Sequence, residues 1–115
     1  MLGKRILVVD DQDLVLQSVK MALTYAGHVV ETATNGPEAL VKVGAGQFDL
    51  VITDWKMPGM TGEELAHEIK QRQGLLPVIL LTGYPPESQS PDIDFVLLKP
   101  FSIAEIRKAI ETLAP

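Results

Sequence analysis

Short apolar runs recur along this chain and indicate buried strands. Continuous runs of this length, rich in Ile, Val and Leu, are typical of strands that are buried on both faces of a parallel sheet. The clear runs are Ile6–Val9, Val51–Thr53 with Leu50 before it, Val78–Leu81 and Phe95–Leu98, and Val29–Thr32 is a weaker one. We therefore predict five parallel strands.

Helical spacing of apolar residues fills most of the stretches between these runs. One face of the first helix is predicted to carry Val15, Val19, Ala22, Leu23 and Ala26, and Gly27 follows as a stop. Pro37 favours the first turn of a short second helix, which runs towards Gly44.

Two capping boxes predict the starts of two further helices. In each, a Ser or Thr at the N-cap exchanges hydrogen bonds with a Glu three residues later. The pairs are Thr61 with Glu64 and Ser102 with Glu105. The last helix is predicted to bury one apolar stripe, made of Ile103, Ile106, Ile110 and Leu113. Strands that alternate with helices in this way indicate an α/β fold with a doubly wound, five-stranded parallel sheet.

The stretch from Thr82 to Asp94 breaks the alternation. Only twelve residues, 83–94, return the chain to the next parallel strand, and three of them are prolines. Pro91 disfavours helical geometry at Ser90, so we expect at most about one helical turn, from Pro86 to Gln89. The sheet face over the fourth and fifth strands should then be thinly covered. We hypothesise that this face docks onto a partner, a second copy or a neighbouring domain.

Composition and charge narrow the class of protein. A chain of 115 residues is long enough for one domain with a single core. Its formal charge of −5 argues against nucleic acid as a partner, because that affinity comes mostly from Lys and Arg. The chain has no cysteine, and none of its apolar runs approaches the roughly 20 residues of a membrane span. We expect a cytoplasmic protein that does not contact a membrane.

Polar residues stand at the ends of four of the predicted strands. Asp10 and Asp11 end the first, Asp54 the third, Thr82 the fourth and Lys99 the fifth. Ligands of open α/β sheets bind at these carboxyl ends, where the winding direction changes. Three carboxylates brought together there would repel one another unless a cation compensates them. An oxygen-only site of this kind suits Mg²⁺, and the Lys99 ammonium adds positive charge.

Four motifs in order carry a resemblance to a known family. They are "ILVVDD", "DLVITDWKMPGMTGEEL", "VILLTGY" and "LLKPFS". Together the chain resembles the receiver domain of two-component response regulators over nearly all of its length. The resemblance implies a flavodoxin-like strand order 2-1-3-4-5, with the family's fourth helix missing or vestigial. It also implies one receiver domain over residues 1–115, with residues 1–4 flexible and with no output domain.

The family's metal ligands match four positions of this sequence. By resemblance, Asp10 and Asp11 form the acidic pair that holds Mg²⁺, and Asp54 and the backbone carbonyl of Lys56 are further ligands. Mg²⁺ is the only cofactor that the resemblance implies.

The family's phosphoryl chemistry matches four positions as well. By resemblance, Asp54 accepts a phosphoryl group from the phosphohistidine of a sensor histidine kinase or a phosphotransfer protein. Thr82 matches the hydroxyl that bonds the phosphoryl oxygen, and Lys99 matches the lysine that contacts the phosphoryl group. Pro100 matches a proline whose peptide bond is usually cis. The protein would then be a phosphoacceptor that catalyses only its own phosphorylation and dephosphorylation, and not otherwise an enzyme.

One departure from the family concerns the residue that responds to the threonine. Most receivers carry an aromatic residue three positions before the lysine, and here that position is Val96. Phe95 should point to the other face of its strand, because side chains alternate along a strand. Tyr84, two residues after Thr82, is therefore a candidate to replace the missing aromatic or to gate water.

Other interpretations stay open at this point. The chain could be a pseudo-receiver that docks without being phosphorylated, or a hydrolase with an aspartate nucleophile, although Lys56 stands where many such hydrolases have a second Asp. Asp10 and Asp11 alone could cap the first helix, Thr82 could be a plain strand-end hydroxyl, and Lys99 could be solvated.

The remaining candidates carry little weight: His28 and His67 lack metal-spaced partners, and Trp55 is expected to be a partly exposed lid. The sequence leaves open the cognate kinase, the output, the oligomeric state, and whether the chain stands alone or belongs to a longer protein.

Overall fold

The computed structural model describes residues 3–84 and 90–115. Within them, strands and helices alternate until β4, after which β5 follows without an intervening helix in the described residues. The elements are β1 (Arg5–Val9), α1 (Asp13–Tyr25), β2 (Val29–Ala33), α2 (Gly36–Ala45), β3 (Leu50–Asp54), α3 (Gly62–Arg72), β4 (Val78–Thr82), β5 (Phe95–Leu98) and α4 (Ile103–Leu113). No helix in the described part of the chain combines the length and hydropathy needed to cross a membrane.

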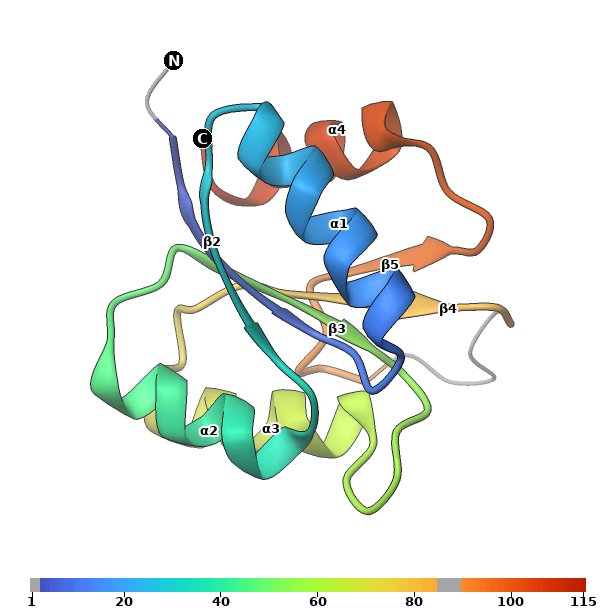
Figure 1. The fold of residues 1–115 in the computed structure, drawn as a ribbon. Helices are drawn as coiled ribbons and strands as arrows, with labels where there is room; N and C mark the ends of the chain where they lie inside the picture. The colour runs from blue at the N-terminus through green and yellow to red at the C-terminus, as the bar shows by residue number, and fades with distance from the viewer. Residues whose placement is uncertain (1–2, 85–89) are drawn as a thin grey trace.

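The strands form one parallel sheet in the order β2-β1-β3-β4-β5, as predicted. Helices α1 and α4 cover one face of the sheet, and α2 and α3 cover the other (Figure 1). Alternate side chains of the central strands enter the two resulting cores, so every residue of β3 and β4 is buried. This explains why these strands are continuous apolar runs in the sequence.

The helix starts follow the predicted capping chemistry. The amide of Glu64 donates to Thr61 Oγ1 at 3.1 Å, and the Thr61 amide donates to Glu64 Oε1 at 3.0 Å. Ser102 and Glu105 make the same reciprocal pair. Helix α2 begins after Asn35, and Pro37 lies in its first turn.

The predicted stripe on the last helix is wrong in one member. Ile106 and Ile110 are buried in the core beneath α1 and α4, and Leu113 packs against it. Ile103, however, is 43% exposed. It lies at the first position of α4, beside Phe101 and the α1 residue Val15, rather than over the sheet.

The second half of the β4–β5 crossover is bound to α3. Neither residues 83–84 nor residues 90–94 form a helix, and the turn predicted at Pro86–Gln89 lies outside the described residues. Asp94 Oδ2 accepts a hydrogen bond from Lys70 Nζ at 2.7 Å and another from the Val78 amide at 2.8 Å. Lys70 also donates to the Leu76 carbonyl at 2.8 Å. The carboxylate therefore fixes the start of β5 to both α3 and β4.

The predicted thin cover over β4 and β5 is wrong for β4, because Ile93 fills that place, but β5 remains partly uncovered. Ile93 is buried in the same core as Leu80 and Val78, and Val96 packs against this core. Among the residues of β4 and β5, the exposed apolar side chains are those of β5 at the sheet edge, where Leu98 is 45% exposed and Phe95 is partly exposed. Ile93, held in place by the hydrogen bonds of the neighbouring Asp94, thus covers β4 where a helix would otherwise lie.

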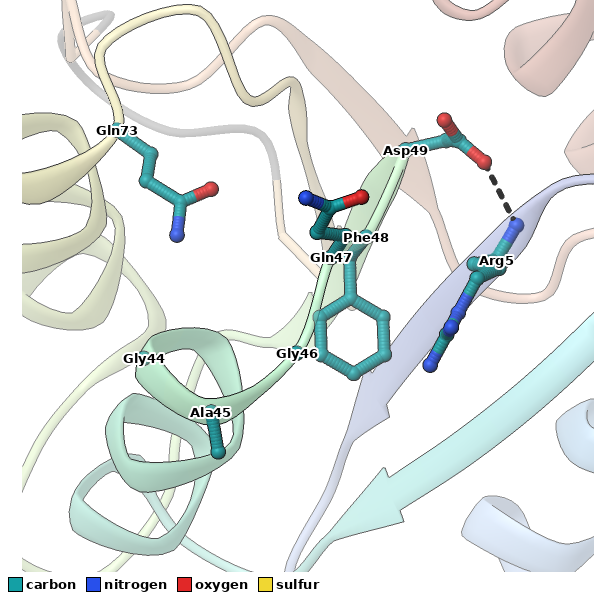
Figure 2. Close-up of a pocket in the computed structure, with 8 residues that line it drawn as sticks. All are labelled: Arg5, Gly44, Ala45, Gly46, Gln47, Phe48, Asp49 and Gln73. Carbon is teal, nitrogen blue, oxygen red and sulfur yellow. Dashed lines mark hydrogen bonds between the residues drawn. The ribbon is translucent and has the colours of Figure 1, made fainter.

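The edge of the sheet where the strands begin carries an open hollow (Figure 2). Asp49 Oδ2 accepts from the Arg5 amide at 2.8 Å, and the Arg5 guanidinium lies 5.8 Å from the centre of the Phe48 ring. These contacts join the start of β3 to the start of β1. None of the residues that line this hollow was predicted to belong to the functional site.

Replacing Asp94 should destabilise the protein more than replacing Asp92. Asp94→Ala leaves Lys70, whose side chain is only 15% exposed, without its counter-charge, and it leaves the Val78 amide unpaired. We expect the free energy of unfolding to fall by about 2 kcal/mol. Among the described residues, the Asp92 carboxylate pairs only with His67, at 3.2 Å, and that imidazole is 58% exposed, so Asp92→Ala should cost less than about 0.5 kcal/mol. Urea unfolding measures both, and equal losses would contradict a special role for Asp94.

Candidate functional site

The predicted polar residues converge at the carboxyl ends of adjacent strands. Asp54 and Thr82 are the last residues of β3 and β4, and Asp10 and Lys99 directly follow β1 and β5. Because β1, β3, β4 and β5 are consecutive neighbours in the sheet, these side chains reach one edge. We call Asp10, Asp11, Asp54, Thr82 and Lys99 the rim site.

An ion pair joins the ends of β3 and β5 across the end of β4. Lys99 Nζ donates to Asp54 Oδ1 at 2.8 Å, and the Asp54 side chain is mostly buried. The Lys99 amide also donates to the Thr82 carbonyl at 2.8 Å, which fixes the backbone of the lysine against β4. The Lys99–Pro100 peptide bond is cis, as expected from the resemblance. Lys99 is therefore not a freely solvated side chain.

Three carboxylates gather beside this ion pair. Asp10, Asp11 and Asp54 each offer an oxygen, and these oxygens lie within 4.8 Å of one another. Asp10 is only 2% exposed. Its Oδ1 accepts from the Gln12 amide at 2.9 Å, but its buried Oδ2 has no hydrogen-bond partner in the described residues.

Burial raises the pKa of the Asp10 carboxyl above its ordinary value. The hydrogen bond from the Gln12 amide opposes this rise, and the neighbouring Asp54 charge adds to it. A buried carboxylate oxygen without a donor is costly, and a hard cation ligated by oxygen would satisfy it. The donor set, oxygen only and partly open, fits Mg²⁺.

Helix capping does not account for the acidic pair. The N-cap of α1 is Gln12, which is extended and makes no side-chain cap. Asp10 instead bonds the amide two residues ahead of it, and Asp11 is exposed. The cap interpretation of the two residues is therefore wrong.

The Thr82 hydroxyl is already bonded within its own turn. It donates to the Tyr84 carbonyl at 3.0 Å and accepts from the Tyr84 amide at 3.2 Å. Thr82 is buried, whereas the Tyr84 side chain is 70% exposed. The hydroxyl must therefore leave the Tyr84 carbonyl before it can donate to another oxygen.

Sequence reasoning missed the contact that seats α3 against Asp54. A Cβ at Gly62 would lie 2.3 Å from the Asp54 carbonyl oxygen, so only glycine allows this approach. The Gly62 amide donates to the Trp55 carbonyl at 2.8 Å. The glycine that follows the Thr61 N-cap is the sequence signal for this close approach, but the capping box alone does not require it.

The residues after Asp54 behave as surface neighbours of the rim site. Trp55 is half-buried and packs against the core, in keeping with the partly exposed side chain that was predicted. The exposed Lys56 ammonium lies 5.3 Å from the centre of the Trp55 ring, a cation–π contact. The role of the Lys56 backbone carbonyl as a ligand stays a prediction.

The position of the missing aromatic is also resolved by the structure. Val96 packs into the core beneath α2 and α3, whereas Phe95 lines a hollow with Ala109 on the α4 side. The two side chains lie on opposite faces, as predicted from strand alternation. Phe95 therefore does not stand in for the aromatic residue of the family.

Neither histidine lies among the residues of the rim site. His28 is buried next to the start of β1, where its Nδ1 accepts from the Lys4 amide at 3.0 Å. His67 is exposed on α3 and pairs with Asp92. In the described residues, the only cluster with metal-ligand spacing is the three carboxylates.

Comparison with known proteins agrees with this geometry. The family model of the response regulator receiver domain matches residues 6–111. The transcriptional regulatory protein TcrA of Mycobacterium tuberculosis is 31% identical over 117 aligned residues, which cover 97% of this chain and 46% of TcrA. The chain thus spans about half the length of the curated relatives it matches.

Solved structures show the same fold. The response regulator protein TrrA of Thermotoga maritima, in complex with Mg²⁺-BeF, is 39% identical with a TM-score of 0.90, and the match covers 96% of this chain and 98% of TrrA. TrrA in complex with the histidine kinase ThkA matches at 37% identity and a TM-score of 0.87, over 97% of this chain and 99% of the matched chain. The chain therefore belongs to the response regulator receiver domain family, the regulatory signalling domains of two-component systems.

Proposed function

We propose that this chain is a phosphoryl-accepting switch, in which Asp54 takes a phosphoryl group from a phosphohistidine. The donor is a sensor histidine kinase or a phosphotransfer protein. The observation that carries the proposal is the Lys99–Asp54 ion pair, at 2.8 Å, beside a buried Asp10 oxygen to which no described residue donates a hydrogen bond. Asp54 thus lies beside a lysine and beside carboxylates that can bind a cation. Phosphoryl transfer requires positive charges placed in this way around the accepting group.

The transfer forms a bond between an Asp54 carboxylate oxygen and phosphorus while the phosphorus–nitrogen bond of the phosphohistidine breaks. The imidazole leaves with that electron pair. The chain's own contribution is position and charge, because the phosphoryl group carries spread negative charge in the transition state. Lys99 holds one Asp54 oxygen, and its ammonium can follow the charge onto the phosphoryl group.

Mg²⁺ is the proposed cofactor at the rim site. Asp10, Asp11, Asp54 and the Lys56 carbonyl would hold it, and the ion would neutralise the phosphoryl oxygens. This chain supports the proposal because Asp10 is buried and no described residue donates a hydrogen bond to its Oδ2.

Thr82 is the proposed reader of the phosphorylated state. Its hydroxyl would donate to a phosphoryl oxygen once it leaves the Tyr84 carbonyl, to which it donates at 3.0 Å. Because the two residues share one turn, Tyr84 would move when the hydroxyl moves. We propose that the exposed Tyr84 ring takes the place of the aromatic residue absent at Val96, or limits water attack on the phosphorylated aspartate.

A groove beside the rim site suits the donor protein. Leu14 on α1 is 84% exposed. It lines an apolar groove with Val15, Phe101 and Ile103, between α1 and the start of α4. Leu14 lies in the first turn of α1, which follows Asp10 and Asp11 in the chain, so a kinase bound there would present its histidine near Asp54. TrrA, which resembles this chain, has been solved in complex with a histidine kinase.

Other predicted features of the protein remain part of the proposal. A second copy or neighbouring domain would use the exposed β5 edge at Phe95 and Leu98. The acidic charge of −5 supports a role without nucleic acid. A single receiver unit, cytoplasmic location and absence of membrane contact rest on the sequence alone.

A docking module that is never phosphorylated is the second candidate. Two observations favour it. The Thr82 hydroxyl is already hydrogen-bonded to Tyr84, and the described residues of the β4–β5 crossover form no helix. Phosphorylation itself separates the two candidates.

Phosphorylation should depend on Asp54 and on Mg²⁺. With Mg²⁺ and a small phosphodonor, we expect the intact mass of the wild type to rise by one phosphoryl group, and Asp54→Asn to stay unmodified. Beryllofluoride should shift the amide signals of Gly83 and Lys99 in the wild type but not in Asp54→Asn. Glu68→Gln, which removes an exposed carboxylate of α3, serves as the control and should behave as wild type. If the wild type shows no Mg²⁺-dependent change, the docking module is the better interpretation.

Removing the Asp10 charge should stabilise the metal-free protein. In EDTA at neutral pH, Asp10→Asn eliminates a buried carboxylate oxygen without a donor, so we expect the free energy of unfolding to rise by about 1–2 kcal/mol. Asp11→Asn, at an exposed position, should change it little under these conditions. Millimolar Mg²⁺ should stabilise the wild type more than either variant. A loss of stability for Asp10→Asn in EDTA would contradict this account of the site.

Truncating Tyr84 should alter the phosphorylated state but not the capacity to form it. Tyr84→Ala keeps the backbone bonds to Thr82, yet it removes the ring. We expect the lifetime of phosphorylated Asp54 to shorten by roughly two- to tenfold, the effect of up to about 1.4 kcal/mol on the hydrolysis barrier. The amide shifts of Gly83 and residues 90–94 on phosphorylation should also change. Tyr25→Ala, on the exposed side of α1, is the control, and an unaltered lifetime with unaltered shifts would rule out the role of Tyr84.

A further inference from the structure

The loop between β3 and α3 carries the Lys56 carbonyl, which is proposed above as a ligand of Mg²⁺. Its two ends are joined by a hydrogen bond, because the Gly62 amide donates to the Trp55 carbonyl at 2.8 Å. Between these ends, residues 56–60 make no backbone hydrogen bond to a helix or strand in the described part of the chain. The position of this part of the loop must therefore be set by the packing of its side chains.

Met60 holds the far end of this loop against the first residue of α2, Gly36. A Cβ at Gly36 would lie 2.9 Å from both Cβ and Cγ of Met60, and closer still to the sulfur, so the Met60 side chain lies directly over the glycine. Gly36 is buried, and Met60 is half-buried and packs against the core beneath α2 and α3. Because the Cβ of Met60 is fixed to its backbone, a side chain at position 36 would displace the loop.

The contact with Met60, and not the backbone conformation, requires a glycine at position 36. Among the glycines that the structure describes, only Gly27 and Gly59 have positive φ angles, so a residue with a side chain could adopt the conformation of Gly36. Alanine is also more favourable than glycine within a helix. Gly44, on the same helix, has no atom within 4 Å of the place where its Cβ would lie. The two positions of α2 thus differ in whether a side chain would meet Met60.

The start of α2 is itself tied to the rim site. The Asp10 amide donates to the Ala33 carbonyl at 3.1 Å. Ala33 ends β2, and α2 begins three residues later, at Gly36. The packing of Met60 on this corner therefore joins the strand end that carries Asp10 to the loop that carries Lys56.

We propose that Met60 is a positioning residue, which sets where the Lys56 carbonyl lies relative to Asp10 by packing over Gly36. The inference rests on the Mg²⁺ site proposed above, because both groups are proposed ligands of that ion. Met60 supplies no ligand atom itself, since its thioether is soft whereas Mg²⁺ prefers oxygen. Loss of the packing contact should weaken the metal site without removing any of its donors.

Met60→Ala should weaken Mg²⁺ binding about tenfold, the lower end of the range found when a group that orients a metal ligand is removed. Trp55 is the only tryptophan of the chain and precedes Lys56 directly, so its fluorescence can follow a Mg²⁺ titration. Met60→Leu conserves the volume of the side chain and should bind Mg²⁺ nearly as well as wild type. Met21→Ala, at a position of α1 that is 70% exposed, is the control and should bind as wild type.

The two glycines of α2 provide a matched pair of variants. Gly36→Ala should weaken Mg²⁺ binding by a factor similar to that of Met60→Ala, because its Cβ displaces the methionine. Gly44→Ala makes the same chemical change on the same helix and should bind as wild type. The proposal is overturned if Gly36→Ala and Gly44→Ala bind Mg²⁺ equally well, or if Met60→Ala keeps the affinity of the wild type.

A measurement in EDTA separates this inference from the metal site on which it rests. Without metal, Met60→Ala should lower the ¹⁵N heteronuclear NOE of the Lys56 and Gly59 amides, because the loop loses its contact with α2, whereas the amides of α4 should keep their wild-type values. If the wild type binds no Mg²⁺, the proposed metal site fails, and the NOE values alone decide the role of Met60. Wild-type NOE values in Met60→Ala would overturn that role in either case.

Discussion

Three carboxylates converge at one edge of this parallel sheet, and their mutual repulsion must be compensated for the chain to fold. Parallel strands must all end at the same edge, so a sheet of order β2-β1-β3-β4-β5 places Asp10 and Asp54 side by side. Repulsion between them would oppose folding unless positive charge lies nearby. Lys99 supplies one such charge at 2.8 Å from Asp54, and Asp10 is left with a buried oxygen to which none of residues 3–84 and 90–115 donates. Leaving that oxygen unsatisfied destabilises the fold. The burial of apolar side chains on β1, β3 and β4, which are almost wholly buried, offsets this loss.

The absence of a helix from the described part of the crossover did not leave the sheet open, and the reason is local chemistry. A covering helix would shield several strand residues at once, whereas Ile93 is the one residue of the described part of the crossover that enters the core beside Leu80. A single residue can do this only if its backbone is held. Asp94 holds it, through hydrogen bonds to Lys70 on α3 and to the Val78 amide of β4. Of these two strands, β4 is therefore fully buried, and the exposed apolar side chains belong to β5.

Sequence patterns predicted the features that depend on neighbours in the chain. Strand positions follow from apolar runs, and the N-termini of α3 and α4 follow from Thr61–Glu64 and Ser102–Glu105, because a capping box is complete within four residues. The residues of the rim site could be predicted because strand order alone brings strand ends together. Three other features depend on contacts across the fold: the carbonyl of Tyr84 engaging Thr82, the close approach of Gly62 to Asp54, and the cover that Ile93 provides. No periodicity in the sequence encodes these, since each is decided by the backbone path of a loop.

The length of β1 separates the rim site from the opposite edge of the sheet, and this distance decides how a charge at Asp54 can influence that edge. Lys4 precedes β1 and Asp10 follows it, and the six residue steps between them, at about 3.3 Å each, span roughly 20 Å. That is more than two screening lengths of about 8 Å at physiological salt, so a charge added at Asp54 acts only weakly through the field on groups at that edge, such as His28. Any stronger coupling would require movement of β1 itself. Its buried side chains and its pairing with both β2 and β3 oppose such movement, so the two edges of the sheet should respond independently.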